Sequence, residues 1–67
     1  MKIVLNNRDV VIDFENISVQ ELIDHKNFSF KMLVTKVNGQ LVKKEDREKV
    51  IIQEGDNVAV IHLISGG

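Results

Sequence analysis

Residues 17–23 read Ile-Ser-Val-Gln-Glu-Leu-Ile and carry the strongest helix signal in the chain. Ser18 and Glu21 match the capping box S-x-x-E, in which each side chain accepts a hydrogen bond from the other residue's main-chain N–H. The apolar residues that follow the cap have the i, i+3, i+4 spacing of one helical face; they are Val19, Leu22 and Ile23. We expect a helix from Ser18 to about Lys26, with this face toward the sheet.

Two pairs of strands flank this helix. Before it, residues 2–6 and 10–14 are rich in β-branched residues and are separated by a polar turn at 7–9, which predicts a hairpin. After it, residues 31–37 and 40–42 flank Asn38-Gly39, a strong signal for a two-residue type I′ turn, in which both central residues have positive φ.

The remainder of the chain consists of a charged run and a last strand. Residues 43–49 are all charged and of mixed sign, which indicates a solvated loop with one helical turn; a docking surface is the alternative. Residues 50–52 return to the core, and 53–56 form a turn. Residues 57–64 form a strand that is apolar on both faces, which is typical of a central strand or of one covered by a partner.

The order strand, strand, helix, strand, strand and final strand is that of a β-grasp fold. This is an α+β architecture in which a mixed sheet of about five strands wraps over one main helix, with the last strand parallel to the first. A chain of 67 residues has room for one domain, spanning residues 1–67. At this size folding buries only about 60% of the surface of the unfolded chain.

Composition excludes several classes of function. The net charge is −1, so the chain lacks the clustered Lys and Arg of a nucleic-acid-binding surface. Cysteine is absent, and His25 and His62 are too few to suggest a metal site. The aromatic residues, Phe14, Phe28 and Phe30, are expected at the core or its edge rather than as a base-stacking platform.

No membrane or secretion signal is seen in the sequence. The longest uncharged apolar run, residues 58–64, is far shorter than the roughly 20 residues of a membrane span. The residues after Met1 include neither a signal-peptide apolar region nor a cleavage site. We therefore expect a cytoplasmic protein that contacts no membrane.

Three stretches together carry a family resemblance: residues 37–42 (Val-Asn-Gly-Gln-Leu-Val), residues 53–58 (Gln-Glu-Gly-Asp-Asn-Val) and Gly66-Gly67. In this order the chain resembles the sulfur carrier proteins of thiamine biosynthesis, the ThiS family, over essentially its whole length. Lys43 departs from the proline that many of these carriers have there. The small subunit of molybdopterin synthase is a related alternative, but those chains are usually longer and often have Pro-Pro where this chain has residues 62–64.

The resemblance implies a function for the tail, residues 65–67. Gly67 is the expected site of sulfur attachment, and Gly66 and Ser65 would thread into a partner. An E1-like adenylyltransferase of the ThiF type uses ATP to adenylate the Gly67 carboxylate, and a cysteine desulfurase supplies sulfur for a thiocarboxylate. A thiazole synthase of the ThiG type receives the sulfur. The carrier itself is then no enzyme, binds no cofactor or metal, and presents one atom on a flexible tail.

A partner-binding patch is expected on the last strand, because one helix cannot cover both faces of a sheet. The predicted set on one face is Val58, Val60, His62 and Ile64. The opposite face offers the alternative set Ala59, Ile61 and Leu63. Two other functions stay open, a ubiquitin-like modifier that is conjugated to lysines through Gly67, and a β-grasp interaction module with incidental terminal glycines.

Overall fold

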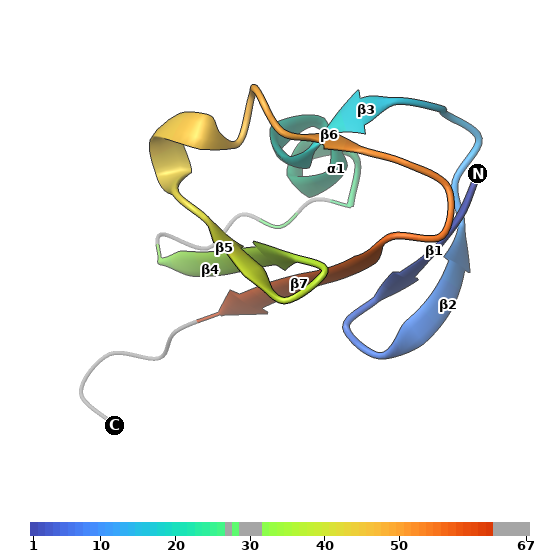
Figure 1. Cartoon of the computed structure of the whole chain (residues 1–67), viewed down its shortest axis with the longest axis horizontal. Helices are drawn as coiled ribbons and strands as arrows, with labels where there is room; N and C mark the ends of the chain where they lie inside the picture. The colour runs from blue at the N-terminus through green and yellow to red at the C-terminus, as the bar shows by residue number, and fades with distance from the viewer. Residues whose placement is uncertain (27, 29–31, 63–67) are drawn as a thin grey trace.

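The computed structural model describes residues 1–26, 28 and 32–62. Its main sheet has five strands in the order β2-β1-β7-β4-β5, and β3 and β6 form a second, small sheet (Figure 1). The elements are β1 Lys2–Leu5, β2 Arg8–Val11, β3 Ile17–Ser18, α1 Val19–His25, β4 Leu33–Val37, β5 Gln40–Val42, the 3-10 helix η1 Lys44–Asp46, β6 Ile51–Ile52 and β7 Asn57–His62.

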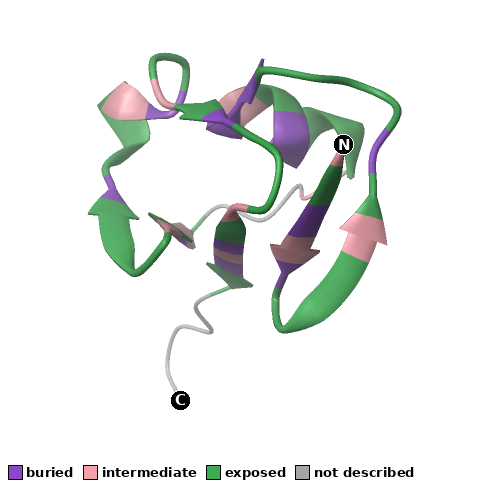
Figure 2. Cartoon of the chain, turned by 45° about the vertical axis from the view of Figure 1, so that its right-hand side comes forward, coloured by how far each residue is buried: buried purple, intermediate pink, exposed green. Residues whose placement is uncertain are grey.

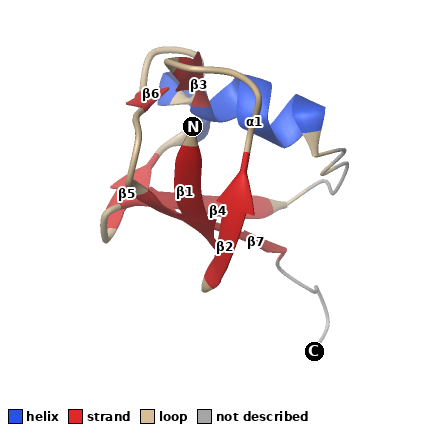
Figure 3. Ribbon diagram, turned by 90° about the vertical axis from the view of Figure 1, so that its right-hand side faces the viewer, coloured by secondary structure: helices blue, strands red, loops and turns tan. Residues whose placement is uncertain are grey.

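The predicted β-grasp architecture is confirmed. β7 lies between β1 and β4, parallel to β1 and antiparallel to β4, as expected of a final strand that is apolar on both faces. Figure 3 shows α1 on one side of the main sheet, with β3 and β6 on that same side. The opposite side of the sheet has no described helix over it.

Helix α1 forms where its capping box predicts. The Glu21 N–H donates to Ser18 Oγ and the Ser18 N–H donates to Glu21 Oε1, both over 3.0 Å, so two otherwise unpaired donors of the first turn are satisfied. The helix ends at His25, with Lys26 as its C-cap. Its three predicted core residues are all buried, namely Val19, Leu22 and Ile23.

The core fills the space between α1 and the main sheet. Figure 2 shows buried residues on the helix and on the strands that face it. The buried apolar residues are Ile3, Leu5, Ile12, Ile17, Val19, Leu22, Ile23, Val42, Ile52, Val58 and Val60. Ile17 and Ile52 join this core through the β3–β6 pair, in which they lie opposite each other. This small sheet is absent from the sequence prediction, because two-residue strands show no periodicity.

The first hairpin is displaced from its predicted position. Its turn is Asn6-Asn7, with φ of 52° and 66°, and β2 therefore begins at Arg8 and ends at Val11 instead of spanning 10–14. Positive φ at both central residues is the requirement of a type I′ turn, and asparagine enters this region more readily than most other residues. The predicted turn at 7–9 is wrong for this reason.

The second hairpin forms as predicted. Asn38 and Gly39 have φ of 52° and 83°, and β5 spans the predicted residues 40–42. β4 begins at Leu33, inside the predicted strand 31–37; residue 31 lies outside the described residues. The turn fixes the register of β4 against β5, with Lys36 opposite Leu41.

The charged run 43–49 contains the predicted helical turn as η1, but one of its side chains is not solvated. Arg47 is only 9% exposed. Its Nη2 donates to the Leu33 carbonyl over 2.7 Å and its Nε donates to Thr35 Oγ1 over 3.3 Å. Arg47 thus ties the loop to β4, because these bonds replace the water that a guanidinium would otherwise need.

We expect Arg47→Ala to lower the free energy of unfolding by about 1–3 kcal/mol, since it removes the donor of the part-buried Leu33 carbonyl and a buried bond to Thr35. Lys44→Ala, in the same run but at an exposed position, is the matched control and should stay within about 0.5 kcal/mol of wild type. Urea denaturation measures both. Equal stability of the two variants would show that the Arg47 contacts contribute nothing.

Candidate functional site

The strand that leads to the tail is held at the centre of the sheet. β7 pairs with β4 from Val37↔Val58 to Leu33↔His62, and with β1 up to Leu5↔Val58. The predicted strand 57–64 is confirmed as far as His62. The predicted tail residues Ser65, Gly66 and Gly67 lie outside the described residues, as does Ile64.

The two faces of β7 differ in burial, and this corrects the predicted patch. Val58 and Val60 are 0% and 4% exposed and belong to the core, so they are no docking surface. His62, in the same predicted set, is exposed. On the opposite face Ile61 is 45% exposed and Ala59 is half-buried. The alternative set is therefore the surface set, with Leu63 outside the described residues. The reason is that α1 covers only the face of Val58 and Val60.

Neighbouring strands extend this surface. Ile61 is paired with Val34, and Lys36 lies between Ala59 on one side and Leu41 on the other. Residues paired across strands point to the same face. We call this set the outer patch; it consists of Val34, Lys36, Leu41, Ala59 and Ile61. Leu41 is 62% exposed. An exposed apolar surface around one cation is typical of a protein-binding site.

Val34 and Leu41 are not among the residues predicted from the sequence. Their signal is the Asn38-Gly39 turn, because a two-residue turn fixes which residues of the flanking strands lie opposite each other. Read with the register of β4 against β7, this places Val34 beside Ile61, and Leu41 one strand farther out on the same face.

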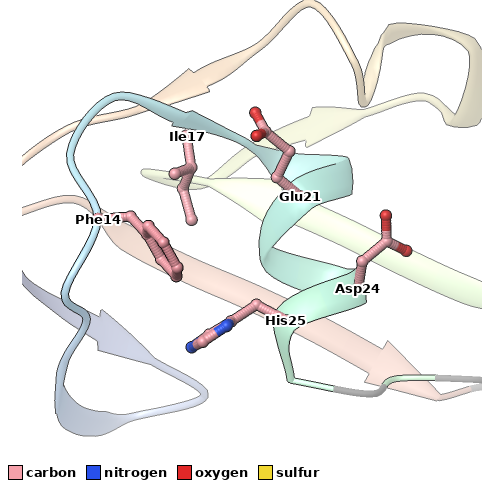
Figure 4. A pocket seen from close by; sticks show the side chains of 5 residues that line it. All are labelled: Phe14, Ile17, Glu21, Asp24 and His25. Carbon is pink, nitrogen blue, oxygen red and sulfur yellow. The ribbon is translucent and has the colours of Figure 1, made fainter.

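A second surface feature is a hollow of about 240 Å³ beside α1, lined by Phe14, Ile17, Glu21, Asp24 and His25 (Figure 4). The rings of Phe14 and His25 meet edge to face, with centroids 5.0 Å apart. Both carboxylates already serve the helix, since Glu21 accepts from Ser18 and Asp24 accepts from the Gln20 amide. Their bonds therefore give these acids a structural role.

The aromatic residues only partly match their prediction. Phe14 is 48% exposed and packs on His25 at the surface instead of in the core. Phe28 is half-buried and packs against the core, as expected. Phe30 lies outside the described residues.

Within residues 1–26, 28 and 32–62, no three His, Cys, Asp or Glu side chains gather where they could hold a metal ion. In the same residues, no helix has the length and apolar character needed to cross a bilayer.

Comparison with known proteins agrees with the fold. A crystal structure of the thiamine biosynthesis protein ThiS from Geobacter metallireducens superposes with a TM-score of 0.89 at 22% identity, covering all of both chains. An NMR structure of a thiamine biosynthesis protein from the same organism superposes with a TM-score of 0.83 at 22% identity, covering 100% of this chain and 88% of that one. No curated protein sequence matches. The sequence model of the ThiS family matches residues 3–67, nearly the whole chain, so the protein belongs to the ThiS family.

Proposed function

We propose that this protein, a sulfur carrier of thiamine biosynthesis by its family, carries the sulfur as a thiocarboxylate on Gly67. The observation that supports this most directly is the family match, which extends over residues 3–67 and so includes Gly66 and Gly67. The chain has no cysteine, so it has no thiol of its own on which sulfur could be held. The terminal carboxylate is then the group that carries it.

The chemistry begins with activation, because a carboxylate is a poor electrophile. An E1-like adenylyltransferase of the ThiF type transfers AMP from ATP to the Gly67 carboxylate and releases pyrophosphate. A protein persulfide, loaded by a cysteine desulfurase, then attacks the acyl carbon: the C–S bond forms and AMP leaves. A thiol cleaves the resulting acyl disulfide, which leaves the thiocarboxylate on Gly67 and a disulfide between the two thiols.

The tail residues allow the Gly67 carboxylate to enter the active site of the partner enzyme. Glycine has no Cβ, so Gly66 and Gly67 fit a channel too narrow for side chains, and Ser65 leads into it. A thiazole synthase of the ThiG type then takes the sulfur. The carrier contributes no acid, base or cofactor to these steps; its folded part positions the tail and is recognised by the partner enzymes.

Intact mass measurement tests the proposal. The carrier is incubated with ATP, the matched adenylyltransferase and a persulfide source, with ATP omitted in the control. Replacement of one oxygen by sulfur, dependent on ATP, is the expected result. A ladder of larger conjugates would point instead to a ubiquitin-like modifier. Sulfur transfer to the large subunit of molybdopterin synthase and not to thiazole synthase would identify the other carrier branch.

The outer patch is the proposed docking surface for the adenylyltransferase. We expect Ile61→Glu to weaken binding about tenfold or more, because a charge would be buried against an apolar partner surface. Val11→Glu is the matched control, since Val11 is 74% exposed on the same face but lies on β2, two strands from β7. The dissociation constant of the Val11→Glu variant should stay within about twofold of the wild-type value, which is a small change in binding free energy.

Binding is measured by isothermal titration and folding by thermal denaturation. Both variants should unfold near the wild-type temperature, because both side chains are exposed. Loss of binding in both variants equally, or unfolding of Ile61→Glu alone, would contradict the assignment of this patch.

A further inference from the structure

Asn6 makes three hydrogen bonds to the last strand. Its main-chain N–H donates to the Val58 carbonyl over 2.9 Å. Its side-chain Oδ1 accepts from the Val60 N–H over 2.8 Å, and its Nδ2 donates to the Val60 carbonyl over 3.1 Å. One residue of the first turn therefore binds both main-chain groups of Val60.

These contacts continue the β1–β7 ladder beyond the end of β1. The strand pairing stops at Leu5↔Val58, because the chain turns away at Asn6-Asn7. A carboxamide carries the same donor and acceptor as a peptide group, so the Asn6 side chain replaces the next residue of the strand. The orientation of the amide follows from its partners, since the Val60 N–H needs an acceptor and its carbonyl needs a donor.

The location of these contacts is what links them to the tail. Val60 lies two positions before His62, where the described part of β7 ends. Along this edge of β7 runs an open hollow of about 380 Å³, lined by the two turn residues Asn6 and Asn7 and by residues 57–62. Among the described residues, the end of β7 thus borders a hollow on this side instead of a neighbouring strand, and the Asn6 side chain binds it there.

We propose that Asn6 is a positioning residue for sulfur loading. By fixing the main chain of β7 at Val60, its side chain sets the course on which the chain leaves the sheet toward Gly67. This inference rests on the proposed function, in which an enzyme must receive that carboxylate in reactive geometry. Misplacing a reacting group by about 1 Å can cost on the order of a hundredfold in rate.

Asn38 supplies a matched control. It has the same φ of 52° in the other hairpin turn. Its Oδ1 accepts from the Asn57 N–H over 2.9 Å, and its Nδ2 donates to Asp56 Oδ1 over 3.1 Å. It therefore also makes two side-chain hydrogen bonds, one to the first residue of β7 and one to Asp56 just before that strand.

The experiment compares Asn6→Gly with Asn38→Gly, because glycine keeps the left-handed turn and removes only the side-chain bonds. Adenylation is followed at varied carrier concentration, at a temperature where circular dichroism shows both variants folded. For Asn6→Gly we expect kcat to fall about tenfold with little change in KM, the signature of a misplaced reacting group. Asn38→Gly should keep kcat within about twofold of wild type, since its bonds lie away from the tail.

Amide hydrogen exchange tests the same inference without a partner enzyme. Asn6→Gly should speed amide exchange at Val60 and Ile61 more than at Val58. Asn38→Gly should instead speed exchange at Asn57. Unchanged exchange at Val60 and Ile61, or equal falls in kcat for both variants, would overturn the inference. Failure of the wild-type carrier to be adenylated would instead contradict the proposed function, and the exchange result would still decide the role of Asn6.

A second substitution covers the case in which Asn6→Gly does not fold. Asn6→Asp keeps an acceptor for the Val60 N–H and the tolerance for positive φ, but it has no donor for the Val60 carbonyl. We expect the same loss in kcat, and Asn38→Gly remains the control, because an aspartate at position 38 would face the Asp56 carboxylate. Wild-type kcat in Asn6→Asp would overturn the inference.

Discussion

A carrier extended by one residue beyond Gly67 is expected to lose adenylation completely. The extension moves the carboxylate one residue farther out and places a side chain where the proposed channel accepts only glycine. Deleting Gly67 shortens the reach by about 3.5 Å, the span of one extended residue, and should have the same effect. Neither change alters a residue of the described core, so we expect thermal unfolding to match wild type. The measurement is ATP-dependent adenylate formation, with intact mass to verify each chain.

Gly67→Ala is the gentler form of this test. It keeps the carboxylate in place and adds one methyl group, so any loss reflects steric exclusion and not missing chemistry. We expect adenylation to fall by on the order of tenfold or more, consistent with the cost of slight misplacement of a reacting group. If a verified extended chain still accepts sulfur and supports thiazole formation, Gly67 is not the attachment site.

Leu22→Ala is expected to remove about 2–5 kcal/mol from the free energy of unfolding, the range found for deleting a buried leucine side chain. Leu22 is 0% exposed and faces the sheet from the centre of α1. A domain of this length has a total stability of roughly 3–10 kcal/mol, so the substitution removes a large share of it and lowers the unfolding midpoint markedly.

Chemical denaturation followed by circular dichroism measures this effect. Lys26→Ala, at the exposed C-cap of the same helix, is the control and should shift the free energy by less than about 0.5 kcal/mol. An unfolding midpoint for Leu22→Ala as high as that of the control would mean that the assigned helix face is not what holds α1 to the sheet.

The helix and the second hairpin were predictable because their signals are local. The reciprocal bonds of Ser18 and Glu21 involve residues three apart, and the Asn38-Gly39 turn depends on the φ preferences of two adjacent residues. The first hairpin follows the same rule with Asn6-Asn7. The predicted position of this turn is wrong because a turn without glycine carries a weaker sequence signal for positive φ.

The site was predictable only in part. The three family stretches, which include the terminal glycines, are visible in the sequence, and they point to Gly67. The sequence does not show which face of β7 is exposed, because the residues on both faces are apolar. Val58 and Val60 lie on one face, and Ala59 and Ile61 lie on the other. Hydrophobicity alone cannot rank two apolar faces; the helix decides by covering one of them.

The sequence by itself determined the element order, the start of α1, the Asn38-Gly39 turn and the family. Each depends on residues close in the chain or on motif order. Only the tertiary structure decided the burial of Arg47, the β3–β6 pair, the outer patch and the contact of Asn6 with Val60. These join residues far apart in sequence. Such a contact forms only when packing of the whole core offsets the entropy of closing the intervening loop, and no local pattern records that balance.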